Sequence, residues 1–235
     1  MMDKEAYIKF LEKIIMDKEA YIKILENIIE NIIANSVKPL KNIPFNIVIK
    51  AISGKDVLKF DENNPEHKKV LELLIQVAEE TGRRINKEGI IRTRANEVGN
   101  DIEKYVLDVF EELKINAQRP KGKSAGYPDI EFEFNGRIYY LECKTFNLKN
   151  LNSPFRTFYF SPSENFKVKY ETIHFMLSYE VVKEKGFYKV KSYKIISLEN
   201  LLVDLKPEFN SNNIRLYSNQ HGAKILKEGK ICTKL

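Results

Sequence analysis

Residues 127–145 read YPDIEFEFNGRIYYLECKT, which is two apolar-rich runs joined by Asn135-Gly136. This dipeptide is the strongest short-range hairpin signal, because a type I′ turn needs a positive φ angle at both central residues. With Asn135 and Gly136 as the turn, Phe134 pairs with Arg137, and every later cross-strand pair follows from that register. The stretch therefore predicts a β-hairpin.

The register of this hairpin brings three charged side chains together. Asp129 lies directly opposite Glu142, with the two Cβ atoms about 5 Å apart on one face. Two carboxylates placed in this way repel each other unless a positive charge lies between them. Lys144 shares their face, because side chains alternate along a strand. The opposite face carries the residues that we expect in the core, which are Ile130, Phe132, Leu141 and Cys143.

The paired carboxylates predict a site for a divalent metal ion. Oxygen ligands with room for water suit Mg²⁺, with Mn²⁺ as a substitute, rather than zinc. Such an ion stabilises charge on a reacting phosphate and lowers the pKa of a bound water. A nearby lysine can orient or deprotonate that water, or neutralise the scissile phosphate. The alternative is an exposed hairpin with ordinary cross-strand charges, since Glu131 and Glu133 show that acids are tolerated there.

Pro128-Asp129, followed by Glu142-Cys143-Lys144, resembles the PD-(D/E)xK motif of the nuclease superfamily that includes the type II restriction endonucleases. The resemblance implies an α/β fold, with a mixed central sheet flanked by helices. It also implies that Asp129 and Glu142 bind the metal, with the main-chain carbonyl of Cys143 as a further ligand. Lys144 would then assist the attacking water.

Many members of the superfamily also carry a glutamate on a preceding helix. Residues 99–103 (GNDIE) match that helix start, so the resemblance implies that Glu103 is an outer contact to the metal or to its water. Asn100 to Glu103 also spells a capping box, in which Glu103 would satisfy a backbone N–H instead. The resemblance covers roughly residues 40–215, but only the motif residues are carried over.

The segments around the hairpin predict helices before it and strands after it. Asn64-Pro65 is typical of an N-cap and first turn, with Gly82 as the matching stop, and a second helix follows residues 96–100. Strand-like alternation begins at about Ile130 and recurs in two later segments, 172–182 and 187–196. This order indicates an α/β or α+β fold, with a mixed sheet backed by helices.

The N-terminal region contains an internal repeat. Residues 2–15 (MDKEAYIKFLEKII) recur almost unchanged as residues 16–29, a period of two heptads. The repeat predicts a helix in a short coiled coil or helical hairpin, with Lys18 as a defect in its apolar stripe. A helix docked on its own domain and a recent duplication are the alternatives. We therefore expect a helical segment at 1–36 and a nuclease domain at 37–235.

The charge of the chain is compatible with a polyanionic partner. The formal net charge is +6 and the isoelectric point is about 9.0. Basic residues gather between Thr81 and Arg94 and again just before the hairpin, although a solvated loop would explain each cluster as well. The candidate contacts to double-stranded DNA are Arg83, Arg84, Arg92, Arg94, Lys121, Lys123 and Arg156.

Other residue types suggest no second site. Cys143 and Cys232 make no disulfide framework, and the N-terminus lacks the layout of a secretory signal, so we expect a cytoplasmic protein. No apolar stretch is long enough to suggest a membrane span. The histidines are scattered, and His174 in an alternating strand is predicted to be packed or paired.

These patterns predict a Mg²⁺-dependent type II restriction endonuclease that hydrolyses double-stranded DNA at a short specific sequence. A single site cuts one strand, so cleavage of both strands of a palindrome predicts a homodimer. One alternative is a repair or junction-cutting nuclease of the same superfamily. Another is a non-catalytic DNA-binding or coiled-coil interaction protein.

Overall fold

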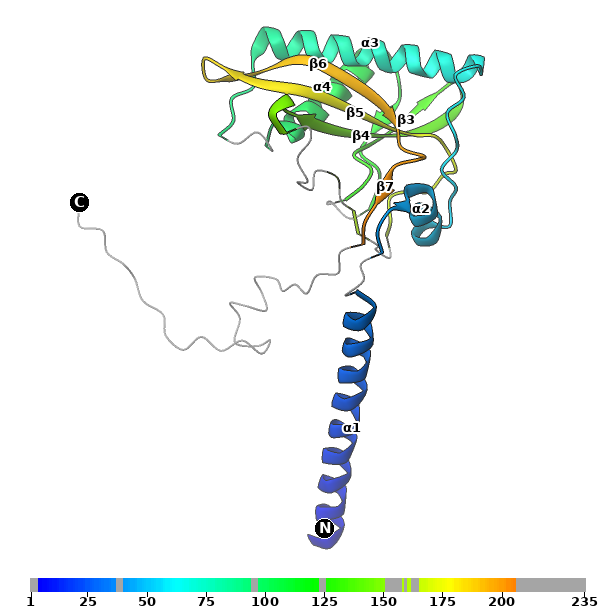
Figure 1. Ribbon diagram of the computed structural model, residues 1–235, viewed down its shortest axis with the longest axis vertical. Coiled ribbons are helices and arrows are strands. Elements are labelled where there is room, and N and C mark those ends of the chain that lie inside the picture. The colour runs from blue at the N-terminus through cyan, green and yellow to red at the C-terminus, as the bar shows by residue number, and fades with distance from the viewer. Residues whose placement is uncertain are drawn as a thin grey trace, which may run out of the picture. The chain divides into compact units, whose positions relative to one another are not determined.

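The computed structural model describes residues 4–36, 40–93, 97–122, 126–150, 158, 160–161 and 165–205. The chain divides into two compact units, one of which spans Asn42–Val203, while the other comprises Met1–Lys41 with Asp204–Leu235. The unit that starts at Asn42 contains the sheet and helices α2 to α4 (Figure 1). None of the helices in the described ranges has the length and apolar character that crossing a bilayer requires.

A five-stranded sheet forms the centre of the Asn42–Val203 unit, with the strands in the order β2-β3-β4-β5-β6. Strands β4 and β5 are parallel and the other neighbours are antiparallel, so the predicted mixed sheet is confirmed. The bounds are β2 Ala117–Gln118, β3 Ile130–Phe134, β4 Arg137–Phe146, β5 His174–Glu184 and β6 Phe187–Ser197. A 3₁₀ turn, η2, follows β4 at Leu148–Asn150.

The hairpin of β3 and β4 has the predicted register. Phe134 pairs with Arg137 and Ile130 pairs with Leu141. The turn residue Asn135 has a φ angle of 51° and the following glycine one of 72°. Both positive angles are those that a type I′ turn requires, so this local prediction is confirmed.

Helix α3 (Pro65–Glu88) starts where the sequence predicted and ends later. The Asn64 side chain accepts a hydrogen bond of 2.9 Å from the N–H of Glu66, as an N-cap does. The predicted stop at Gly82 is wrong, because the helix continues for nearly two further turns to Gly89. Ile85, which follows Gly82, is buried in the core, and this burial outweighs the helix-weakening effect of a single glycine.

Helix α4 (Val98–Glu112) begins before Asn100, so Asn100 lies inside the helix and is not its cap. The capping-box alternative for Glu103 is therefore wrong. Apolar residues at helical spacing in α4, such as Ile102 and Val106, are buried against the sheet. The side chain of Glu103 is available for another role.

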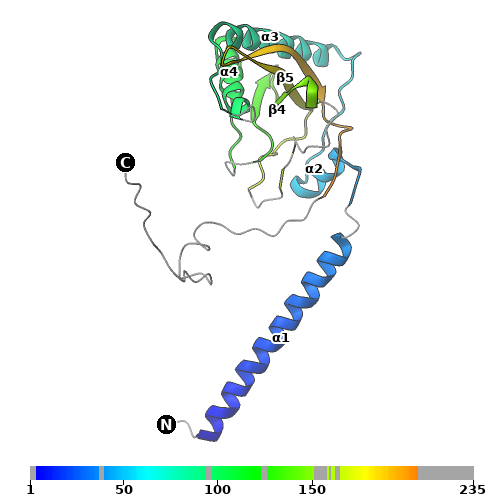
Figure 2. The same ribbon diagram turned by 60° about the vertical axis from the view of Figure 1, so that its left-hand side comes forward.

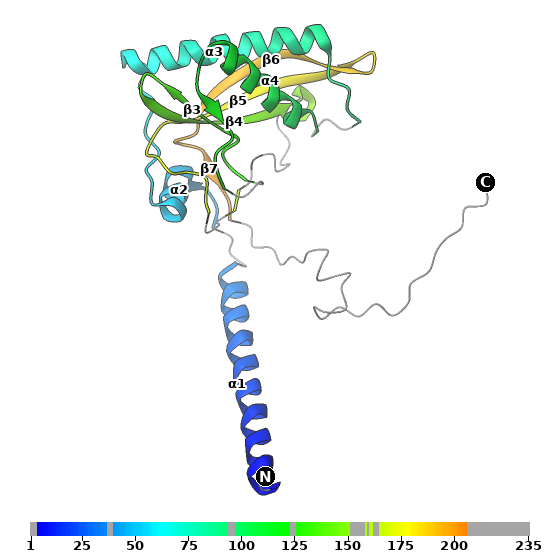
Figure 3. The same cartoon turned by 180° about the vertical axis from the view of Figure 1, so that it is seen from behind.

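Helices α3 and α4 cover one face of the sheet (Figures 1 and 3). The main core lies between them and the inward side chains of the hairpin, including Ile130, Phe132, Leu141 and Cys143, as predicted. A second cluster joins Phe45 and Ile49 of helix α2 (Phe45–Ser53) to Tyr127 and Tyr140. Helix α2 lies apart from α3 and α4, as Figure 2 shows. It follows β1 (Ile43–Pro44), which pairs with β7 (Leu202–Val203) in a short second sheet, and β7 is labelled beside α2 in Figure 1. Because Tyr140 and Leu141 alternate on β4, the second cluster lies on the sheet face opposite the helices.

The repeated N-terminal segment forms helix α1 (Lys4–Ser36), as the heptad pattern predicted. Seven of its large apolar side chains between Tyr21 and Ile32 are exposed. They are Tyr21, Ile22, Ile24, Leu25, Ile28, Ile29 and Ile32. A stripe of this kind suits a coiled coil, and the partner that would cover it stays a prediction.

Candidate active site

The site begins at the open end of the β3–β4 hairpin, where Asp129 precedes the first paired residue of β3. The Asp129 Oδ2 atom accepts a hydrogen bond of 2.9 Å from the backbone N–H of Cys143. This bond ties the aspartate to the strand that carries Glu142. Both carboxylates therefore lie at the open end of the hairpin. The ladder itself ends at the pair Ile130–Leu141, so the predicted direct pairing of Asp129 with Glu142 is not part of it.

Lys144 places its ammonium beside both carboxylates. Its Nζ atom donates to Glu142 Oε1 and lies 3.7 Å from Asp129 Oδ2. Burial by itself lowers the pKa of Lys144, but the attraction of Glu142 and Asp129 outweighs it, so the pKa is raised. Lys144 is therefore protonated at neutral pH, and it neutralises part of the charge of the pair.

Glu142 is almost fully buried, with 3% of its surface exposed. Its burial and, next, the charge of Asp129 raise its pKa to about 7, against the opposing effect of Lys144. Its Oε2 atom is buried and has no hydrogen-bond partner among the described residues. A buried carboxylate oxygen without a partner is costly, and a cation would supply the missing contact.

Glu103 reaches the same region from helix α4. Burial and then the nearby charge of Asp129 raise the pKa of Glu103, while Arg119 and Lys144 lower it. Arg119, which follows β2, places its Nη2 atom 3.3 Å from Glu103 Oε2. The charge of Asp129 therefore acts on both Glu142 and Glu103, with Lys144 and Arg119 as the counter-charges.

The donor set fits a hard cation that keeps some of its waters. In the described ranges, no three His, Cys, Asp or Glu side chains come close enough to hold a metal by themselves. The hairpin instead offers the carboxylates of Asp129 and Glu142, and the buried Oε2 atom of Glu142 has no partner among the described residues. Mg²⁺ is commonly held by one or two carboxylates, with waters and phosphate oxygens in its other positions.

The predicted DNA contacts fall into three groups. Arg94, Lys123 and Arg156 lie outside the described residues. Lys121 is exposed. The other three are Arg83, Arg84 and Arg92, and each forms ion pairs with acids of its own chain.

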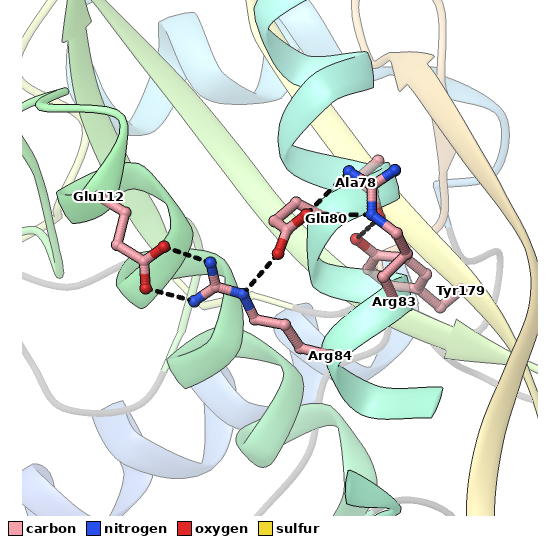
Figure 4. A network of polar contacts seen from close by, with 6 residues as sticks. All are labelled: Ala78, Glu80, Arg83, Arg84, Glu112 and Tyr179. Atoms are coloured by element: carbon pink, nitrogen blue, oxygen red, sulfur yellow. Dashed lines mark hydrogen bonds and ion pairs between the residues drawn. The ribbon is translucent and has the colours of Figure 1, made fainter. Parts of the chain in front are cut away.

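Figure 4 shows how Arg83 and Arg84 are held on α3. Arg84 binds Glu80 on its own helix and Glu112 at the end of α4, while Arg83 binds Glu80. Arg84 therefore links the two helices that cover the sheet. Arg92 binds Asp101 through two hydrogen bonds of 2.6 and 2.7 Å. DNA contact by these arginines stays a prediction, and it would require them to exchange a carboxylate for a phosphate.

Two residues near the site were not singled out by sequence reasoning. Tyr127 is buried, and its hydroxyl lies 2.6 Å from Nδ1 of His174 on β5, so His174 is packed and paired as expected. Lys167 is buried and binds the loop that leads to Asp129. Neither contact has a local sequence signal, because the partners are far apart in the chain.

A mixed sheet with two helices on one face and this Asp, Glu and Lys set on a hairpin defines a nuclease of the PD-(D/E)xK type. The comparison with known families is more specific. Residues 39–220 match the type II restriction enzyme MjaV family, and the chain belongs to that family. Helix α1 (Lys4–Ser36) precedes the matched range.

A relative from Methanocaldococcus jannaschii, the type II restriction enzyme MjaV, is 38% identical over 209 residues. The similarity spans 80% of this chain and 91% of the relative. Type II restriction enzymes are site-specific endonucleases that act on double-stranded DNA, generally with a divalent metal, and this chain is one of them. The repair-nuclease and non-catalytic alternatives are thereby set aside.

Proposed function

We propose that Asp129, Glu142 and the carbonyl of Cys143 bind Mg²⁺, or Mn²⁺ in its place, for hydrolysis of a DNA phosphodiester bond. The observation that carries this proposal is the buried, unpartnered Oε2 atom of Glu142 beside a second carboxylate. When bound, the cation supplies positive charge to the reacting phosphate and makes the attacking water more acidic. The raised pKa of Glu142 shows how strongly this carboxylate needs a positive neighbour in order to stay ionised.

Lys144 has a different part in the reaction. In its protonated form it donates hydrogen bonds, so it can orient the attacking water or bind an oxygen of the scissile phosphate. Its contact with Glu142 supports this part, because it puts the ammonium beside a proposed metal ligand. Glu103, which is held by Arg119, acts as an outer contact that accepts a hydrogen bond from water near the metal.

The proposed enzyme is a homodimer that works in the cytoplasm, where foreign DNA enters a cell. Paired active sites, related by a two-fold axis, would cut both strands of a symmetric sequence. The exposed apolar stripe of α1 is one route to the dimer. The alternative is that α1 docks on its own domain and that other surfaces form the dimer. The candidate DNA contacts are Arg83, Arg84, Arg92, Arg94, Lys121, Lys123 and Arg156.

Plasmid cleavage in Mg²⁺ tests the metal site. Asp129→Asn and Glu142→Gln should each lower the cleavage rate by about 100-fold or more, because a metal ion contributes several kcal/mol of charge stabilisation. DNA binding measured without metal should persist. Glu133→Gln is the control, since Glu133 is an exposed acid of the same hairpin. Wild-type turnover in either of the first two variants would show that the metal ligands are wrongly assigned.

A further inference from the structure

Lys167 is a buried lysine whose ammonium binds the loop that leads to Asp129. Only 8% of its surface is exposed. Its Nζ atom donates to the carbonyl oxygen of Gly126 at 2.8 Å and to that of Pro128 at 3.1 Å. These two carbonyls lie on either side of Tyr127, and the second belongs to the residue directly before Asp129. A buried positive charge is costly unless it is hydrogen-bonded. The two hydrogen bonds of the Lys167 ammonium offset this cost and fix the position of the loop before Asp129.

The backbone of Asp129 needs such support because it lies outside the strand ladder. Strand β3 begins at Ile130, so cross-strand pairing does not hold the aspartate itself. Its side chain is held by the N–H of Cys143. The carbonyl that precedes Asp129 is held by Lys167. Lys167 therefore sets the backbone position from which the Asp129 carboxylate reaches toward Glu142.

The segment around Lys167 is also attached to the strand that carries Glu142. The residues on either side of Lys167, which are Phe166 and Val168, are buried in the second core cluster. Further along, the backbone N–H groups of Lys169 and Tyr170 donate to the hydroxyl of Tyr140 at 2.8 and 3.2 Å. Tyr140 lies on β4, two residues before Glu142. One short segment thus binds both the loop of Asp129 and the strand of Glu142.

Gly122 lies very close to the segment that contains Lys167. A Cβ atom built at Gly122 would lie 2.8 Å from the carbonyl oxygen of Asn165 and 2.8 Å from Cγ of Lys167. These distances are shorter than normal contacts, so a side chain at Gly122 would displace the side chain of Lys167 or the backbone at Asn165. The close approach offers a second way to disturb the contact without removing the charge of Lys167.

We propose that Lys167 is a positioning residue that sets the spacing between Asp129 and Glu142, and through it the affinity of the site for a divalent cation. The inference rests on the metal site of the proposed function. Without the ammonium, the loop can shift, and a displacement of about 1 Å is enough to disturb a site of this kind. Residues that orient metal ligands typically change affinity by about 10- to 100-fold when they are replaced.

Mn²⁺ binding to the full-length protein without DNA, measured by calorimetry, tests the proposal. Lys167→Met should weaken Mn²⁺ binding by about 10- to 100-fold. DNA binding in the absence of metal should stay within about twofold, because the global charge changes by only one unit. The matched control is Lys169→Met, which removes the same charge from an exposed position two residues away and should bind Mn²⁺ like the wild type. A lysine with a merely structural role would lower the melting temperature without weakening Mn²⁺ binding by the folded protein.

The Asp129→Asn variant distinguishes a failure of the Lys167 proposal from a failure of the proposed metal site. If Asp129→Asn loses Mn²⁺ binding while Lys167→Met keeps wild-type affinity, Lys167 is not a positioning residue and the metal site stands. If Asp129→Asn binds Mn²⁺ like the wild type, the proposed metal site fails and the inference about Lys167 fails with it. Should Lys167→Met not fold, Gly122→Ala takes its place, and wild-type Mn²⁺ affinity in that variant overturns the proposal.

Discussion

Acid should destabilise this protein through His174, a histidine that the fold keeps neutral. His174 is fully buried on β5, and its Nδ1 atom lies 2.6 Å from the hydroxyl of Tyr127. Its Nε2 atom has no hydrogen-bond partner within the described part of the chain. Burial lowers the pKa of His174 from 6.5 to about 3, because the charged imidazolium would lose its hydration.

The magnitude follows from proton linkage. In the unfolded chain the imidazole takes up its proton near pH 6.5, whereas in the folded protein it does so only near pH 3. The unfolded state therefore binds more protons between these values, and the free energy of unfolding falls as the pH is lowered through this window. At pH 4.5, two units below the unfolded pKa, the loss from this group is about 2.7 kcal/mol. Total stabilities are about 5–15 kcal/mol, so the loss is readily measured.

Urea unfolding at pH 7.5 and pH 4.5 measures this loss. His174→Asn removes the titrating group, and its Oδ1 atom can still accept a hydrogen bond from Tyr127. The variant leaves a cavity, but that cost is the same at both pH values and cancels in the comparison. The wild type should lose about 2.7 kcal/mol more than the variant between the two conditions. His67→Asn is the control, because the ring of His67 is partly exposed. An equal loss in wild type and His174→Asn would refute the argument.

Three further predictions concern the rest of the molecule. If Arg92 binds a phosphate, Arg92→Gln should flatten the slope of log DNA affinity against log salt by about 1, whereas an unchanged slope would exclude the contact. Gly89→Ala should cost about 2–4 kcal/mol in urea unfolding, because φ is +77° and the new Cβ would lie 2.7 Å from Phe187. Gly99→Ala, which meets nothing within 4 Å, should instead stabilise α4 by up to about 1 kcal/mol, and similar losses in both variants would contradict this. Light scattering should show that the full-length protein is a homodimer. If a truncated protein that lacks residues 1–36 stays dimeric, α1 is not part of the interface. A full-length protein that is monomeric both alone and on DNA would disprove the paired-site arrangement.

The arginines on α3 show where charge along a sequence is misleading. A run of basic residues predicts a surface for DNA, but acids from other segments can neutralise the same side chains in the fold. Glu112 is far from Arg84 in the chain and binds it directly. Charge counts on a linear sequence cannot include such a partner, because it depends on how α3 and α4 pack.

The sequence by itself determined the hairpin, its register and the three charged residues at its open end. These features are local: Asn135-Gly136 sets the turn and the register, and strand alternation then puts Glu142 and Lys144 on one face of β4. Asp129 directly precedes the paired residues of β3. The order of helices and strands, and the N-cap at Asn64, were predictable for the same reason. Turn, strand and cap preferences depend on residues that are adjacent in the sequence, so the sequence alone predicts them.

Only the tertiary structure decided what lies around those residues. Gly82 was predicted to end α3, yet burial of Ile85 extends the helix. The start of α4 excludes the cap at Asn100, and the fold brings Glu103 within the influence of Asp129. Burial of apolar surface and contacts between distant segments contribute more free energy than the local preferences that they override.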